Sequence, residues 1–289
     1  MPFLFQRACI IGVGLIGGSL ARAAKQKHLI GHISGYSRRL SHLQQASELG
    51  VVDSFSTDLA EAVDACDLIV LATPLKSMPA ILDQLAKLVS DDVVITDVGS
   101  AKRGVIAAVI NAFGKLPENF IAGHPIAGTE KSGVEASFAE LYRQRRVILT
   151  PDASTSQITL GRVKQLWQGV GAEVETMSAA HHDEVLAATS HVPHVLAFTL
   201  VDTLAKMQEH SEIFRFAAGG FKDFTRIASS DPEMWRDISV ENSDAILSVL
   251  KRFQSSLSEL CGAIEQQDGE KIEQIYRRAK QARDEHVTG

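Results

Sequence analysis

Short apolar runs alternate with amphipathic helical segments through the first half of the chain. Strands are predicted at residues 7–11, 32–36, 67–72, 93–98, 119–122, 146–149 and 172–176. Helices are predicted at residues 15–27, 40–49, 78–88, 102–113 and 157–170. Apolar strands that alternate with helices indicate βαβ units and a parallel sheet covered on both faces.

The pattern changes after Met177. From there to the end the strand signal almost disappears, and apolar residues recur at helical spacing, as in Ile246, Val249, Leu250, Phe253, Leu257, Leu260 and Ile264. We therefore expect a Rossmann-type α/β domain with a doubly wound parallel sheet in residues 1–177 and an all-helical domain in residues 178–289. The helical part has much apolar surface for its size, which favours burial against a second subunit.

A glycine-rich turn, Gly12-Val13-Gly14-Leu15-Ile16-Gly17, follows the first predicted strand and opens the first helix. Gly12 permits the tight turn, Gly14 lets the backbone approach a pyrophosphate, and Gly17 lets the helix pack on the strand. The helix N-terminus adds free N–H groups and a positive dipole end. We assign to a dinucleotide site Gly12, Gly14, Leu15, Ile16 and Gly17, with Thr73 and Pro74 from the end of another strand.

The end of the second strand bears on which dinucleotide binds. NAD sites usually place Asp or Glu there, on the ribose 2′-hydroxyl. This chain has Ser37, Arg38 and Arg39 and no carboxylate. Guanidinium groups pair well with phosphate oxygens, so the segment favours the 2′-phosphate of NADP over NAD. The alternative is that both arginines are solvated residues at the start of a helix.

Candidate chemistry follows two later strands. Ser100, in the segment from Asp97 to Lys102, lies at the carboxyl end of a strand, where open α/β sheets bind ligands. It either contacts the substrate or caps the next helix. His124 lies in a predicted Gly- and Pro-rich loop, where it is a candidate to take a proton as a hydride leaves.

The helical half contributes two further segments. Asp183 and His194 are candidates to line a cleft between the domains, and Arg226 is a candidate clamp for a carboxylate or else a surface ion-pair partner. A metal site of His191, His194 and Asp183 is disfavoured, because hydride transfer needs no metal and Pro193 distorts the spacing of the two histidines. We expect no metal.

Composition narrows the class of protein. The 289 residues carry 29 Lys and Arg against 35 Asp and Glu, a formal net charge of −6, which argues against a nucleic-acid binder. The three cysteines are far apart, which favours a reducing cytoplasm. The apolar start of the chain, residues 8–20, contains four glycines and is too short to span a membrane, and no other run is expected to span one.

Five segments together resemble the prephenate/arogenate (cyclohexadienyl) dehydrogenases of tyrosine biosynthesis. They are GVGLIGGS at residues 12–19, DVGSAK at 97–102, GHPIAGTEKSG at 123–133, SHVPH at 190–194 and GGFKDFTRIA at 219–228. The resemblance covers essentially the whole chain. It implies an NAD(P)-binding domain joined to a helical domain that forms a homodimer, with oxidative decarboxylation of prephenate or arogenate as the reaction.

The resemblance also implies roles for individual residues. His124 matches the histidine that hydrogen-bonds the C4 hydroxyl of the substrate and accepts its proton, and Ser100 matches the serine that orients both groups. Arg226 matches an arginine that binds a substrate carboxylate. The matching pocket positions are Thr129, Glu130, Ser190 and His194, and Lys222 and Asp223 match a charged network near the pocket that reaches in from the partner subunit.

Some relatives differ from this chain. Many carry an acidic residue where Ser37 stands, which argues against strict use of NAD. Some have an additional regulatory or mutase domain, for which this chain shows no matching segment. We therefore expect no control by a separate domain here, although tyrosine could still compete for the substrate pocket. Two alternatives stay open: a β-hydroxyacid or imine reductase of the same two-domain plan, and a dinucleotide-sensing protein without turnover.

Overall fold

A computed structural model describes residues 2–129, 131–208 and 210–286. Their contacts divide the chain into two compact units, residues 1–243 and residues 244–289. This division does not fall at Met177, because helices that follow Met177 pack directly on the α/β part. The division between a cofactor domain and a helical domain at Met177 stays a prediction.

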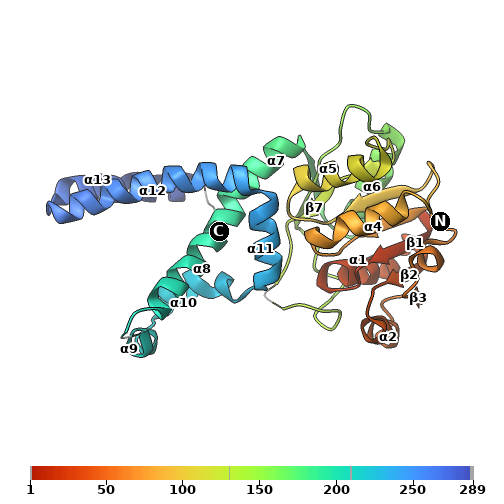
Figure 1. The fold of residues 1–289 in the computed structure, drawn as a ribbon, viewed down its shortest axis with the longest axis horizontal. Helices are drawn as coiled ribbons and strands as arrows, with labels where there is room; N and C mark the ends of the chain where they lie inside the picture. Colours follow the sequence, from red (N-terminus) through yellow and green to blue (C-terminus); the bar gives the residue numbers. More distant parts are fainter. Residues whose placement is uncertain (1, 130, 209, 287–289) are drawn as a thin grey trace. The chain divides into compact units, whose positions relative to one another are not determined.

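A six-stranded parallel sheet forms the centre of the first unit, in the order β3-β2-β1-β4-β5-β6 (Figure 1). The strands are β1 (Phe5–Ile11), β2 (Ile30–Tyr36), β3 (Ser54–Ser56), β4 (Leu68–Leu71), β5 (Val94–Asp97) and β6 (Phe120–Ile121). The chain runs outward from β1 to β3 and then returns to β4 on the other side of β1. The order therefore reverses beside β1, which is where open α/β sheets bind dinucleotides.

Alternate residues of β1 enter two separate apolar clusters. Ala8 and Ile10 pack with Trp167 and the residues around it, whereas Cys9 and Ile11 pack with Leu82 and its neighbours. The first cluster holds buried residues of α1 (Leu15–Gln26), α2 (Leu40–Glu48) and α6 (Gln157–Gly169). The second holds buried residues of α3 (Leu59–Val63), η1 (Leu75–Ser77), α4 (Met78–Leu85) and α5 (Lys102–Phe113). Helices thus cover both faces of the sheet, as the apolar strands predict.

A second, three-stranded sheet corrects the expectation of a single parallel sheet. It consists of β7 (Gly123–Pro125), β8 (Arg146–Leu149) and β9 (Glu173–Thr176), with β7 antiparallel to β8 and β8 parallel to β9. The prediction of a loop at residues 123–130 is therefore wrong for its first three residues. His124 lies in β7, opposite Ile148 of β8.

The helices after Met177 begin with one continuous helical segment. It comprises α7 (Ala179–Leu186), a π-helical turn η2 (Ala187–His191) and α8 (Val192–Ala205). The first unit continues with α9 (His210–Arg215), α10 (Gly219–Thr225), the 3₁₀ turn η3 (Arg226–Ser229) and α11 (Pro232–Glu241). Pro232 begins α11, and the Asp231 side chain caps it by accepting from the N–H of Met234.

The segment 179–205 is, within the described part of the chain, the one helix long and apolar enough to cross a membrane. The expectation that no such run exists is therefore wrong by length and composition. A single helix of this kind is weak evidence for a span, because core helices of soluble proteins satisfy the same criterion. Its first half carries His182, Asp183 and His191, whose buried side chains bond to other parts of the unit.

The second unit is a pair of helices, α12 (Ser243–Glu265) and α13 (Gly269–His286), which lie side by side in Figure 1. An ion pair at 3.4 Å joins Lys271 of α13 to Glu259 of α12. The helical spacing predicted α12, but several of its apolar side chains are exposed in the isolated chain, namely Leu247, Phe253, Leu257 and Ile264. Monomeric soluble proteins rarely expose a contiguous apolar face, and such faces often mark interaction surfaces.

Candidate active site

The glycine-rich turn has the geometry that a dinucleotide requires. Gly12 has φ +98°, and a Cβ there would lie 2.5 Å from the carbonyl oxygen of Ala72. A Cβ on Gly17 would lie 2.4 Å from the carbonyl oxygen of Gly12, so α1 packs against the turn only because Gly17 has no side chain. A Cβ on Gly14 would meet no atom within 4 Å, which leaves open space at the helix start.

The N-terminus of α1 faces that space, and within the described residues no side chain caps it. Gly14 is the N-cap, no side chain caps the helix, and its first turn holds no acidic residue. The unsatisfied N–H groups and the helix dipole are therefore available to a diphosphate, and the residues present fit a nicotinamide dinucleotide. Among the described residues, the Thr73 hydroxyl is buried without a hydrogen-bond partner beside this turn, and Pro74 follows it on the surface.

The end of β2 lies beside the turn, where the N–H of Gly12 donates to the carbonyl oxygen of Tyr36. Ser37 is half-buried, and its hydroxyl accepts from the N–H of Arg39 at 3.3 Å. Arg38 and Arg39 are exposed. The described residues 37–39 thus present two cations and a hydroxyl beside the turn.

Three buried polar side chains form a hydrogen-bonded series that joins β7 to α7. His124 Nδ1 lies 2.9 Å from Nε2 of His182, and Nδ1 of His182 lies 2.8 Å from Oδ1 of Asp183. His124 is 8% exposed, His182 is fully buried and Asp183 is 1% exposed. Residues that are 58 positions apart in the sequence are thereby joined.

Asp183 also caps α5. Its carboxylate accepts from the N–H of Lys102 at 2.8 Å and from the N–H of Arg103 at 3.0 Å, the first two residues of that helix. The N-cap residue itself, Ala101, supplies no side-chain bond. A carboxylate at a helix N-terminus satisfies orphan N–H groups and complements the dipole. Ser100 therefore does not cap α5; it is half-buried in the loop between β5 and α5.

Burial sets the ionisation of this chain. The pKa of His124 lies well below its ordinary value of 6.5, because burial and the nearby His182, Lys102 and His191 all disfavour its charged form. Burial likewise lowers the pKa of His182, although its bond to Asp183 acts in the opposite direction. For Asp183, burial acts to raise the pKa, but the bonds from His182, Lys102 and Arg103 outweigh it and the pKa is lowered. At neutral pH, His124 and His182 are therefore neutral imidazoles and Asp183 is a carboxylate.

His194 lies further along the same helical segment, in the first turn of α8. Its Nδ1 donates to the carbonyl oxygen of Ser190 at 2.9 Å, and its ring stacks on Trp235 with centroids 3.5 Å apart. Burial lowers its pKa, and the charge of Arg226 lowers it further, so Arg226 lies within electrostatic range of His194. The structure thus brings together Ser190, His194 and Arg226.

Other predicted site residues lie on the surface of the single chain. Thr129 is exposed in the loop after β7, where its hydroxyl accepts from the N–H of Lys131. Lys222 and Asp223 are exposed on α10, and Glu130 lies outside the described residues. Nδ1 of His191 lies 3.1 Å from the side-chain amide nitrogen of Asn242.

The local sequence pattern predicts no role for His182, Lys102 or Asp97. Lys102 donates to Asp97 and, at 2.5 Å, to the carbonyl oxygen of Gly123, immediately before His124. Two signals were available: a lysine at the first position of a helix, five residues after an aspartate at a strand end, and the His-Asp dipeptide at 182–183.

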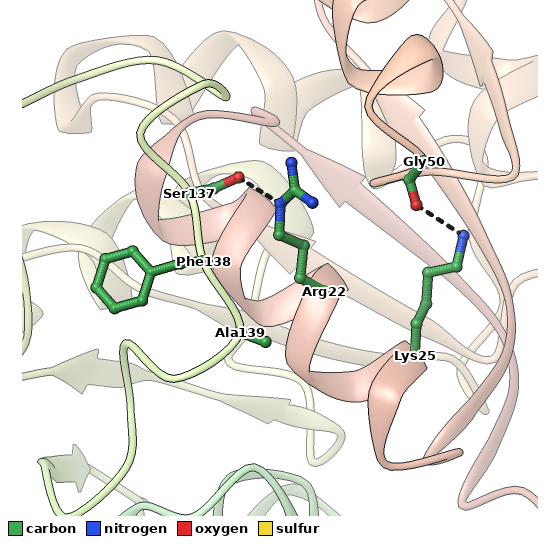
Figure 2. Close-up of a pocket in the computed structure, with 6 residues that line it drawn as sticks. All are labelled: Arg22, Lys25, Gly50, Ser137, Phe138 and Ala139. Atoms are coloured by element: carbon green, nitrogen blue, oxygen red, sulfur yellow. Dashed lines mark hydrogen bonds between the residues drawn. The ribbon is translucent and has the colours of Figure 1, made fainter.

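A hollow of about 470 Å³ lies elsewhere, along the C-terminal half of α1 (Figure 2). Its two cations already have protein acceptors. Arg22 donates to the Ser137 hydroxyl at 2.9 Å, and Lys25 contacts the carbonyl oxygen of Gly50 at 3.1 Å and the carboxylate of Asp53 at 2.6 Å. This end of α1 also carries the negative end of the helix dipole, so the hollow is not the dinucleotide site.

Comparisons with known proteins agree with this geometry. Residues 20–176 match the family model described as prephenate dehydrogenase, nucleotide-binding domain, and residues 178–278 match prephenate dehydrogenase, dimerization domain. The chain belongs to the prephenate dehydrogenase family. It is therefore an oxidoreductase with a nicotinamide dinucleotide site in its Rossmann-type part.

Individual members of the family are similar over nearly their whole length. The cyclohexadienyl dehydrogenase of Zymomonas mobilis is 38% identical over 97% of this chain and 96% of its own. The prephenate dehydrogenase of A. aeolicus, solved with hydroxyphenyl propionate and NAD+, is 40% identical, with a TM-score of 0.91 over 97% of this chain and 98% of its own. The Synechocystis arogenate dehydrogenase is 26% identical, with a TM-score of 0.81 over 98% of this chain and 100% of its own.

Proposed function

We propose that the protein catalyses the oxidative decarboxylation of prephenate, arogenate or both, with hydride transfer to NAD(P), in tyrosine biosynthesis. The observation that carries the proposal is His124, a buried and neutral histidine in β7, the strand that begins two residues after the end of β6. A neutral imidazole is the form that accepts a proton. The family and its members that act on prephenate and arogenate supply the substrate class.

The residues divide the reaction between them. A nicotinamide dinucleotide held at the turn formed by Gly12, Gly14 and Gly17 would supply the acceptor for a hydride from C4 of the substrate ring. As the hydride leaves, the C4 hydroxyl proton passes to His124 and a C4 carbonyl forms, with Ser100 orienting the hydroxyl. Loss of CO2 from C1 returns an electron pair to the ring, the oxygen regains a proton, and the ring becomes aromatic. Arg226 holds a substrate carboxylate, and the remaining predicted pocket positions are Thr129, Glu130, Ser190, His194, Lys222 and Asp223.

NADP is the cofactor that the end of β2 favours. The segment from Ser37 to Arg39 offers cations and a hydroxyl, and no carboxylate that would repel a 2′-phosphate. The A. aeolicus relative was solved with NAD+. Rates with NAD and with NADP test which of the two this protein prefers.

A homodimer completes the proposal. The exposed apolar face of α12, including Phe253, Leu257 and Ile264, needs a cover, and the matched family model is a dimerization domain. Light scattering on the purified chain tests the oligomeric state, and a monomer at micromolar concentration contradicts the dimer.

The cysteines favour a reducing compartment. All three are free thiols, which is the state that a compartment such as the cytoplasm maintains.

Initial rates of reduced-nicotinamide formation test the reaction. Prephenate and arogenate are each combined with NAD and NADP, and turnover with either substrate supports the proposal. Silence in all four combinations from folded, cofactor-binding protein overturns it. That outcome favours either a binding protein without turnover or a β-hydroxyacid or imine reductase. Rates measured with β-hydroxyacids and with imines distinguish these two alternatives.

A further inference from the structure

The hydrogen bond between His124 and His182 has a direction that its neighbours determine. Asp183 is the fixed end of the chain, because its carboxylate accepts from the N–H groups of Lys102 and Arg103 and has no proton to give. Nδ1 of His182, at 2.8 Å from Oδ1, must therefore carry the proton and donate it.

The state of the second ring follows from the first. Since a neutral imidazole carries one proton, a donating Nδ1 leaves Nε2 of His182 as a lone pair. That nitrogen lies 2.9 Å from Nδ1 of His124, a hydrogen-bond distance that requires a proton between the two atoms. The proton must belong to His124.

We infer that His182 is a positioning residue which holds His124 in the tautomer with the proton on Nδ1, so that Nε2 is the lone pair that receives the substrate proton. The inference rests on the proposed function for the identity of that proton. His182 itself is fully buried and touches no solvent, so it acts through His124 alone.

The same chain stabilises the charged form that the reaction creates. When Nε2 of His124 takes the C4 hydroxyl proton, the O–H bond breaks and the imidazole becomes a cation. Its Nδ1–H then donates to His182, whose own Nδ1–H donates to the Asp183 carboxylate. The Asp183 carboxylate thereby stabilises the imidazolium of His124 through the two hydrogen bonds of His182. No proton passes to Asp183, as in other histidines oriented by a buried carboxylate.

Two near-isosteric variants separate this role from simple packing. His182→Gln retains an acceptor oxygen for the Nδ1–H of His124, whereas His182→Met fills a similar volume without a strong acceptor. We expect kcat to fall roughly tenfold or more in His182→Met, with KM changed less than about twofold, because a histidine in the wrong tautomer cannot act as base. We expect His182→Gln to restore most of kcat. Equal losses in the two variants overturn the inference.

A spectroscopic measurement tests the tautomer without relying on turnover. The protein is labelled with ¹⁵N-histidine, and long-range ¹H–¹⁵N correlation spectra distinguish a protonated Nδ1 from a protonated Nε2; His124→Gln identifies the resonance. The expected result is Nδ1–H for His124 in the parent protein and in His182→Gln, lost in His182→Met. A protonated Nε2 in the parent overturns the inference. An Nδ1–H tautomer in a protein that turns over neither substrate overturns the proposed function and leaves the inference standing.

Discussion

Lys102 and Asp97 form an ion pair in which both side chains are completely buried. Asp97 also accepts from the N–H groups of Gly99 and Gly123, and Lys102 donates to the carbonyl oxygen of Gly123. The pair thus ties the end of β5 and the start of α5 to the strand that carries His124. Each charge depends on the other, because removal of either partner leaves an uncompensated charge in the interior.

Removing one member of this pair should be costly. We expect Lys102→Met to lower the free energy of unfolding by about 3–5 kcal/mol, because it leaves the Asp97 carboxylate buried without its counter-charge. Chemical denaturation measures the change. The control is Lys25→Met, which breaks a partly exposed pair with Asp53 and should cost about 1 kcal/mol or less. Similar losses in both variants would show that burial does not make the Lys102–Asp97 pair special.

His124 should control the chemical step. We expect His124→Asn to lower kcat by roughly 10²–10⁴-fold, the usual contribution of a general base, with dissociation constants for substrate and cofactor largely unchanged. Steady-state rates and equilibrium titration measure the two effects. His181→Asn, on an exposed histidine of α7, is the matched control and should leave kcat unchanged. Near-normal kcat in His124→Asn would remove His124 from the mechanism.

Arg226 should act mainly in binding. We expect Arg226→Ala to raise KM for the substrate roughly tenfold to hundredfold, with a smaller effect on kcat, since it loses a charged hydrogen bond to a carboxylate. Arg145→Ala, on an exposed arginine, should leave KM unchanged. If KM in Arg226→Ala equals that of the parent, the carboxylate is bound elsewhere.

The end of β2 should determine the cofactor preference. We expect Ser37→Asp to lower the ratio of kcat/KM for NADP to kcat/KM for NAD by roughly tenfold or more. A carboxylate there binds the ribose hydroxyls of NAD and repels the 2′-phosphate. Arg38→Ala should weaken NADP more than NAD by loss of a phosphate partner. A parent enzyme that already prefers NAD would contradict the assignment of these residues.

The buried histidines should make stability depend on pH. Burial lowers the pKa of His191 from 6.5 to about 4, so the unfolded chain binds this proton at a higher pH than the folded one. The free energy of unfolding should therefore fall as the pH drops from about 6.5 to about 4, by about 3 kcal/mol for His191 alone. His124 and His182 shift in the same direction and add to the slope.

Denaturant titrations at several pH values test this slope. His191→Gln removes one titrating group, so its free energy of unfolding should depend less steeply on pH between about 6.5 and about 4, whatever its stability at neutral pH. His42→Gln, on an exposed histidine, is the control and should leave the slope unchanged. An unchanged slope in His191→Gln would show that the pKa of this ring is the same in the folded and unfolded states.

Much of the fold was predictable from local pattern. The bounds of α5 and β8 agree with the prediction residue for residue, because α5 is long enough to show helical spacing and β8 is an apolar run that ends before Thr150 and Pro151. The glycine turn was predictable for a similar reason, since the spacing of its glycines reports backbone geometry directly. β3, α3 and β7 were missed. They have three, five and three residues, too few for a period to show.

The sequence by itself determined the class of fold, the dinucleotide turn and the candidate base His124, since each depends on residues that are neighbours in the chain. Only the tertiary structure decided that β7 pairs with β8, that Asp183 rather than Ser100 caps α5, and that His182 lies against His124. The physical reason is that each of these contacts joins elements that are far apart in sequence. Tertiary packing and the hydrogen-bonding requirement of buried polar groups determine these contacts. The hydrophobic period of a single segment therefore does not predict them.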